Sequence, residues 1–241
     1  MNILQIKNLT KHYGAFKAVD NVSLSIQPGE IFAFIGENGA GKTTTIKAAC
    51  GILTFDGGSI EVDGYDVKRE PFACKKQIAY IPDNPDLYEF LSGIEYLRFV
   101  ADVYGISAED RKVRIEKYAD LFSLTKDLAQ PIASYSHGMK QKLALIAAFI
   151  HEPKLLLMDE PFVGLDPKAA FTVKQIMREI CDAGGAIFFS THVLDVAEKL
   201  CDKVAIIKDG KIIAAGDMAA VRGDQSLENL FLTLTERPTE S

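Results

Sequence analysis

The sequence has no tryptophan, only four cysteines and no long apolar run. Its longest apolar stretches fall well short of the roughly 20 residues that a membrane-spanning helix needs. The cysteines are widely spaced without a Cys-x-x-Cys pair, which argues against a zinc site or disulfide framework and favours reduced thiols in a cytosolic protein. The N-terminus also lacks the basic and apolar regions of a signal peptide. If the protein works at a membrane, we therefore expect another polypeptide to supply the span.

The sequence also contains fewer basic than acidic residues. The 241 residues include 27 Lys and Arg against 33 Asp and Glu, which gives a formal net charge of −6. A mildly acidic chain binds nucleic acid poorly through electrostatics alone, so no nucleic-acid partner is expected. The length and a hydrophobic content of 48% suffice for a substantial core, as one large domain or as a domain with an inserted subdomain.

The segment from Gly36 to Thr43 fits the phosphate-binding pattern Gly-x-x-x-x-Gly-Lys-Ser/Thr without a gap. An apolar run at 31–35 precedes it and predicts a strand buried on both faces, and 43–50 reads as a helix. In this strand–loop–helix context, backbone N–H groups converge on an anion at the positive end of the helix. The residues predicted to bind the nucleotide are Gly36, Glu37, Asn38, Gly39, Ala40, Gly41, Lys42, Thr43 and Thr44.

Two side chains of this loop have predicted chemical roles. Lys42 is expected to reach the β- and γ-phosphates, and the Thr43 hydroxyl to help hold Mg²⁺. The alternative is a glycine-rich turn that binds nothing, which the complete pattern in its strand–loop–helix setting disfavours. The sequence therefore predicts a nucleotide site.

The remaining chain alternates short apolar runs with helical patterns, which predicts an α/β fold with a parallel-sheet core. Alternation at 4–9 and 22–26 indicates half-buried strands, with 11–16 as a turn, and 60–62 extends this into a small antiparallel sheet. Segment 86–150 reads as an inserted α-helical subdomain, with helices beginning at Ser92, at Ser107 and near Ser136. Further strands are predicted at 78–81, 155–158, 186–189, 204–207 and 211–215, and helices at 167–180 and 227–234.

Two strand ends in this pattern carry polar groups that suit phosphate chemistry. Asp159 and Glu160 follow the strand at 155–158, and ligands of α/β sheets bind at the carboxyl ends of strands. Asp159 is expected to hold Mg²⁺, and Glu160 to polarise the water that attacks the γ-phosphorus. His192 follows the strand at 186–189, where it can bond the γ-phosphate and orient that water. Solvated acids at a turn and a structural histidine are the plainer alternatives.

The segment Tyr135-Ser136-His137-Gly138-Met139 resembles the Leu-Ser-Gly-Gly-Gln signature of the ATP-binding cassette ATPases, a family of P-loop NTPases. Ser136 and Gly138 match the signature, whereas His137 and Met139 depart from it. The resemblance implies that this helix N-terminus caps the γ-phosphate of ATP held by a partner chain. The order of motifs agrees with the family to about residue 216.

The same resemblance assigns three further positions. Tyr13 matches the aromatic residue that stacks on adenine, and Gly164-Leu165-Asp166 matches the loop that crosses the dimer interface. Asp83 stands where the family has a glutamine that senses Mg²⁺ and the attacking water. A carboxylate there can ligate Mg²⁺, and Asp83 can equally be a turn residue after Pro82. Segments 87–88 and 96–99 resemble the bacterial branch that exports drugs, peptides or polysaccharides.

The resemblance implies a single cassette domain over residues 1–218. Segments 1–85 and 151–218 would form the nucleotide-binding core with its antiparallel subdomain, 86–150 the helical subdomain, and 219–241 a short C-terminal helix and tail. The implied cofactors are ATP and Mg²⁺. The implied partners are a separate integral-membrane permease subunit and a second cassette chain, identical or different, at the cytoplasmic face of the membrane. The alternatives are a soluble cassette ATPase of translation or DNA repair, and a P-loop kinase of small metabolites.

Overall fold

The computed structural model describes residues 1–236, and its centre is a six-stranded sheet in the order β10-β9-β3-β8-β7-β6. All residues of the three central strands are buried, which matches their unbroken apolar runs and the helices that cover both faces of the sheet. Strands β6 to β9 with β3 run parallel, and β10 is antiparallel to β9. The strands are β3 (Ile31–Ile35), β6 (Ile78–Ile81), β7 (Leu155–Asp159), β8 (Ala186–Thr191), β9 (Lys203–Lys208) and β10 (Lys211–Asp217).

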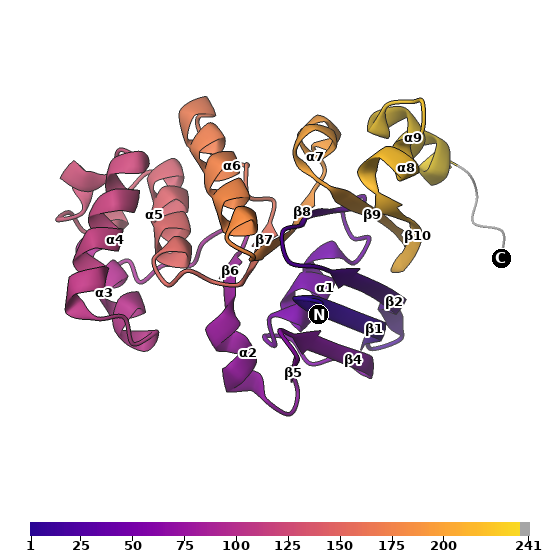
Figure 1. Cartoon of the computed structure of the whole chain (residues 1–241), viewed down its shortest axis with the longest axis horizontal. Coiled ribbons are helices and arrows are strands. Elements are labelled where there is room, and N and C mark those ends of the chain that lie inside the picture. Colours follow the sequence, from indigo (N-terminus) through magenta and orange to yellow (C-terminus); the bar gives the residue numbers. More distant parts are fainter. Residues whose placement is uncertain (237–241) are drawn as a thin grey trace.

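A second, antiparallel sheet in the order β2-β1-β4-β5 lies beside the first (Figure 1). It contains β1 (Leu4–Tyr13), β2 (Phe16–Ile26), β4 (Gly57–Val62) and β5 (Tyr65–Asp66). Helix α1 (Lys42–Ala49) packs between the two sheets, since its Ile46 belongs to one buried cluster with Phe34 of β3 and Leu4 of β1. This cluster holds the start of α1 in place from both sides.

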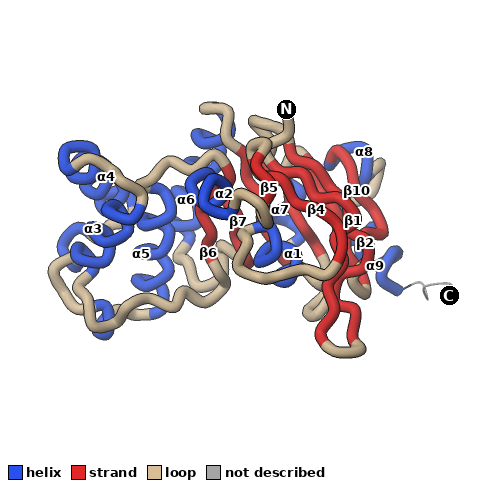
Figure 2. The backbone as a smooth tube through the Cα atoms, turned by 90° about the horizontal axis from the view of Figure 1, so that it is seen from below, coloured by secondary structure: helices blue, strands red, loops and turns tan. Residues whose placement is uncertain are grey.

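Three helices form a separate block at one end of the molecule, as Figures 1 and 2 both show: α3 (Gly93–Val103), α4 (Ala108–Leu121) and α5 (His137–Phe149). Helix α3 begins after Ser92, as expected, with a capping box in which the Ser92 hydroxyl accepts from the Glu95 amide. The other helices are α2 (Pro71–Gln77), α6 (Pro167–Asp182), α7 (Leu194–Leu200), α8 (Met218–Arg222) and α9 (Leu227–Glu236). Among the described helices, none has the length and apolarity needed to cross a bilayer.

The predicted fold class is confirmed, and the structure differs from the sequence analysis in one prediction and adds two features that were not predicted. The supposed turn at 11–16 is mostly strand, because β1 runs to Tyr13 and β2 starts at Phe16. Strand β10 is antiparallel, since a two-residue turn joins it directly to β9. Short helices α2, α7 and α8 were not predicted. Residues 237–241 of the expected C-terminal tail lie outside the described part of the chain. The residue-level division into domains stays an interpretation.

Candidate functional site

The predicted phosphate loop connects β3 to α1, and close packing explains its glycines. A Cβ on Gly36 would lie 2.5 Å from the carbonyl oxygen of Ile207 in β9. A Cβ on Gly41 would lie 2.5 Å from the carbonyl oxygen of Ala18 in β2, and Gly41 has a φ of +109°. Neither contact accommodates a side chain. The loop is therefore fitted against both sheets at the N-terminus of α1.

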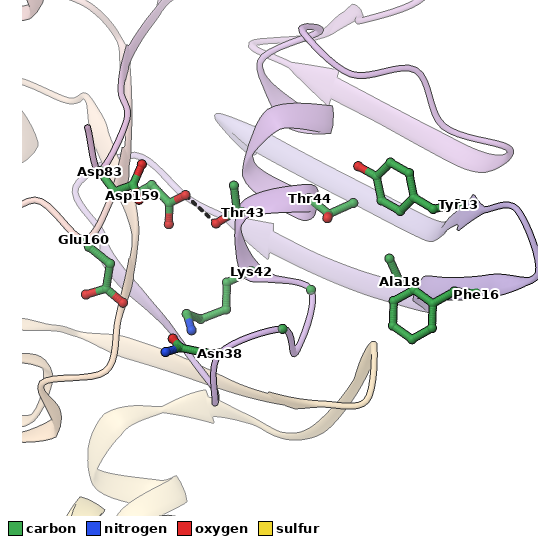
Figure 3. A pocket seen from close by; sticks show the side chains of 12 residues that line it. Tyr13, Phe16, Ala18, Asn38, Lys42, Thr43, Thr44, Asp83, Asp159 and Glu160 are labelled. Carbon is green, nitrogen blue, oxygen red and sulfur yellow. Dashed lines mark hydrogen bonds between the residues drawn. The ribbon is translucent and has the colours of Figure 1, made fainter. Parts of the chain in front are cut away.

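A cavity of about 320 Å³ opens beside this loop. Figure 3 shows the acidic residues Asp83, Asp159 and Glu160 on one side and the rings of Tyr13 and Phe16 on the other. The cavity thus has an acidic end and an aromatic end, with the phosphate loop between them. Its lining consists of Tyr13, Phe16, Ala18, Asn38, Gly39, Gly41, Lys42, Thr43, Thr44, Asp83, Asp159 and Glu160.

Lys42 is only 7% exposed, and its ammonium is held by the loop itself. Its Nζ donates to the carbonyl oxygens of Gly36, at 2.7 Å, and Glu37, at 3.1 Å. Burial lowers the pKa of Lys42, while the carboxylates of Glu160 and Asp159 act in the opposite direction. A phosphate placed in the cavity would offer this buried cation a fully charged acceptor in place of neutral carbonyls.

Thr43 and Asp159 meet at the acidic end of the cavity. The Thr43 hydroxyl donates to Asp159 Oδ2 at 2.5 Å, and the Ser190 hydroxyl donates to Asp159 Oδ1. The carboxylate is 2% exposed, so it is a buried negative charge that two hydroxyl groups orient. A hydroxyl oxygen next to a carboxylate is the kind of oxygen donor set that Mg²⁺ prefers. These residues therefore fit the cation that the sequence predicts.

The backbone of Glu160 is hydrogen-bonded to the neighbouring strand β8. Its amide donates to the carbonyl oxygen of Ser190 at 3.2 Å, and its backbone adopts a positive φ of +49°. One carboxylate oxygen, Oε1, lies 3.0 Å from Nδ1 of His192, and the other accepts from the His192 amide at 3.4 Å. A positive φ in a residue other than glycine is strained backbone that recurs at functional sites. His192 thus contacts the predicted base rather than lining the cavity itself.

Asp83 lines the cavity, and its Oδ1 also accepts from the Asn84 amide at 2.8 Å. The first observation suits a ligand of Mg²⁺ and the second suits a turn residue, so both interpretations of Asp83 persist. Ser136 lies apart, at the start of α5, where its hydroxyl accepts from the Met139 amide at 3.3 Å. Within residues 1–236, Ser136 and Gly138 do not line the cavity that contains Lys42.

Phe16 and Ala18 line the cavity but were not predicted. Both belong to the start of β2, and Phe16 pairs with Tyr13 across the hairpin. The available signal was the aromatic residue on each side of Gly14 and Ala15, which becomes informative once 11–16 is interpreted as a tight hairpin.

Comparison with known proteins shows the family to which the chain belongs. Residues 19–163 match the family model described as ABC transporter, so the chain belongs to the ABC transporter family of ATP-binding domains and is an ATP hydrolase. The ABC-type transporter ATP-binding protein EcsA of Bacillus subtilis (strain 168) is 38% identical over 98% of this chain and 98% of its own length. The Nod factor export ATP-binding protein I of Cupriavidus metallidurans is 34% identical over 97% of this chain and 80% of its own length.

Solved structures share the fold. A structure described as the ATP-binding subunit of an ABC transporter has a TM-score of 0.94 and 38% identity, and covers 97% of this chain and 100% of its own. The ATP-binding cassette MJ0796, solved as a dimer bound to ADP and Pi, has a TM-score of 0.82, 22% identity, and coverage of 89% and 98% respectively. At 22% identity, the similarity to MJ0796 shows a shared fold and nothing more.

Proposed function

We propose that this chain is the ATP-hydrolysing subunit of a membrane exporter, peripheral to the cytoplasmic face of the membrane through a separate permease. The observation that carries the proposal is the single cavity that joins Lys42, Thr43, Asp159 and Glu160 at one end to two exposed aromatic rings at the other. Such a cavity suits a triphosphate with a base at its far end. The Tyr13 ring, 50% exposed, would stack on that base.

The chemistry follows from the acidic end. Lys42 would exchange the loop carbonyls for the phosphate oxygens. Thr43 and Asp159, with Asp83 as a further oxygen donor, would hold Mg²⁺, which neutralises the charge that develops on the phosphates. Glu160, oriented by His192, would accept a proton from the attacking water. His192 in turn would keep the Glu160 carboxylate in place.

The start of α5 supports a two-chain arrangement. Ser136 is exposed and Gly138 half-buried, and both lie outside the cavity of their own chain. A helix N-terminus with an exposed serine offers amide and hydroxyl groups to an anion. We infer that this anion is the γ-phosphate of ATP bound by a second cassette, identical or different. ATP would then draw two chains together, and hydrolysis would release them.

An exposed aromatic cluster supports a membrane partner. Tyr88, Phe90, Tyr96 and Phe99 pack together, with the Tyr88 ring 5.7 to 6.1 Å from the other three. Phe90 is 83% exposed and Tyr88 49% exposed, so the cluster exposes apolar surface to solvent. A cavity of about 230 Å³ beside it includes Leu87 and Tyr96. A short cytoplasmic helix of the permease, with an apolar anchor, would fill this groove.

Export, rather than import, is supported by the similarity to the Nod factor export ATP-binding protein I of Cupriavidus metallidurans. The structure of CbiO1 from Clostridium perfringens is described as part of the ABC transporter complex cbiONQ, so a cassette of this fold works within such a complex. A soluble role in translation or DNA repair has no comparable observation in its favour.

The decisive experiment is an affinity pull-down of this chain from detergent-solubilised membranes of its source. We expect a polytopic membrane protein without an ATPase domain of its own. Phe90→Ser should reduce its recovery, whereas Phe171→Ser, which changes an equally bulky side chain that is 61% exposed on α6, should not. Recovery of ribosomal or DNA-processing proteins, with no membrane protein, would contradict the proposal.

A further inference from the structure

His137 occupies a position where the family signature has glycine, and its ring makes a contact that glycine cannot make. It is the first residue of α5, and the ring lies against Gly164. A Cβ on Gly164 would lie 2.9 Å from Cδ2 and 3.0 Å from Nε2 of His137. A Cβ on Gly138 would lie 3.2 Å from the Gly164 carbonyl oxygen. Gly164 is thus seated against the first two residues of the helix.

Gly164 lies in the middle of the loop 160–166, whose two ends are held independently. At one end Glu160 is bound by Ser190 and His192. At the other end Asp166 caps α6 and forms an ion pair with Lys142 of α5 at 2.6 Å. Between the ends, the half-buried Phe162 packs edge-on against Phe189, with ring centroids 5.9 Å apart.

The apex of this loop, Val163 and Gly164, is exposed to solvent. Val163 is 44% exposed, and a φ of +78° at Gly164 turns the chain there. The ring of His137 packs on this turn, so the apex loses this packing contact if it moves away from α5. Glu160 lies four residues earlier in the chain, so a packing contact at the apex adds to the contacts that Ser190 and His192 make with it.

His137 also borders a second loop that carries a predicted site residue. It lines a cavity of about 450 Å³ together with Asn84, Pro85, Asp86 and Leu87, the residues that follow Asp83. Glu89 and Lys140 complete this lining and form an ion pair with each other. One imidazole therefore stands between the loop after Glu160 and the loop after Asp83.

We propose that His137 is a positioning residue for ATP hydrolysis, which holds the apex of loop 160–166 against the N-terminus of α5. Through this contact, the position of Ser136 and the orientation of Glu160 become coupled within one chain. The inference rests on the proposed roles of Ser136 and Glu160. It also gives the departure from the family signature at this position a physical reason.

The test is a double-mutant cycle on the ATPase activity of the full chain. Gly164→Ala adds backbone strain and a clash with the imidazole, whereas in a His137→Ala background only the strain remains. We expect Gly164→Ala to lower kcat about tenfold alone but about threefold or less in the His137→Ala background, the non-additivity of residues in contact. KM for ATP should stay within about twofold, since the contact lies outside the cavity.

A matched control isolates the contact from the strain. Gly184→Ala introduces the same side chain at a φ of +88°, where nothing lies within 4 Å of the new Cβ, and should leave kcat unchanged. His137→Ala alone should lower kcat about fivefold, and His137→Phe, which keeps a planar ring on Gly164, should restore most of the loss. Circular dichroism and ATP binding verify that each variant is folded.

Equal effects of Gly164→Ala in the two backgrounds, or a wild-type kcat in His137→Ala, would overturn the role of His137. A wrong assignment of the proposed site would give a different experimental result. If Glu160→Gln hydrolyses ATP at the wild-type rate, the site assignment is wrong. If that variant is inactive while the cycle is additive, the site assignment stands and the inference about His137 alone is wrong.

Discussion

We expect the protein to lose folding stability at acid pH, in part because of His151. This residue joins the helical block to the edge strand β6. Its Nε2 lies 3.1 Å from the carbonyl oxygen of Ile78, and its ring stacks on Tyr104 with centroids 3.7 Å apart. Burial lowers the pKa of His151 from 6.5 to about 4. Carbonyl oxygens of Ile78 and Ala147 oppose this shift, and the positive charge of Arg114 adds to it.

The sign and size of the effect follow from proton linkage. Between the folded pKa of about 4 and the unfolded value of 6.5, the unfolded chain binds more protons at this histidine than the folded chain does. Stability from this group is therefore complete above pH 6.5 and falls as the pH drops toward 4. The loss amounts to about 2 kcal/mol by about pH 5.

His151→Phe tests the argument, because phenylalanine keeps a ring for Tyr104 and removes the titrating group. Urea unfolding followed by far-UV circular dichroism at pH 7.5 and pH 5 gives the free energy of unfolding of both proteins. All other titrating groups are shared, so their contributions largely cancel in the difference between wild type and variant. We expect the variant to gain about 2 kcal/mol relative to wild type between these two pH values. Parallel pH profiles for the two proteins would refute the reasoning.

Three further predictions concern the cavity. Lys42→Ala should weaken ATP binding about a hundredfold by removing a charge-assisted hydrogen-bond donor, as equilibrium dialysis would measure, and unchanged binding would contradict the phosphate-loop role. Tyr13→Ala should weaken ATP binding about tenfold but leave inorganic triphosphate unaffected, because only the base is stacked; equal losses for both ligands would exclude stacking. Asp83→Gln should shift the Mg²⁺ concentration that gives half-maximal activity, and a flat response would make Asp83 a turn residue only.

Local patterns allowed much of this site to be predicted from sequence. The apolar run before Gly36, the complete phosphate-loop pattern and the helix after it are contiguous, so their geometry follows from neighbouring residues. Asp159 was assigned because it follows a buried strand, and ligands of α/β sheets bind at the carboxyl ends of strands. These inferences needed no knowledge of long-range contacts.

The remaining features depend on tertiary packing. Phe16 enters the cavity only because β1 and β2 continue as a hairpin past the end of the alternating apolar pattern. The contact between His137 and Gly164 joins the first residue of α5 to a loop residue 27 positions later, and no local pattern encodes it. The antiparallel direction of β10 follows from the two-residue turn that joins it to β9. A prediction based on the alternation of strands and helices does not detect such a turn.

The most direct test of the account is the ATPase activity of Glu160→Gln, measured together with its ATP affinity. Glutamine has nearly the same shape as glutamate but cannot take the proton of the attacking water. We expect ATP affinity to stay within about twofold of wild type and turnover to fall at least about a hundredfold, the scale of general-base catalysis. Retained binding with that loss of turnover would support Glu160 as the base at this site. Near-normal turnover would contradict the account at its centre.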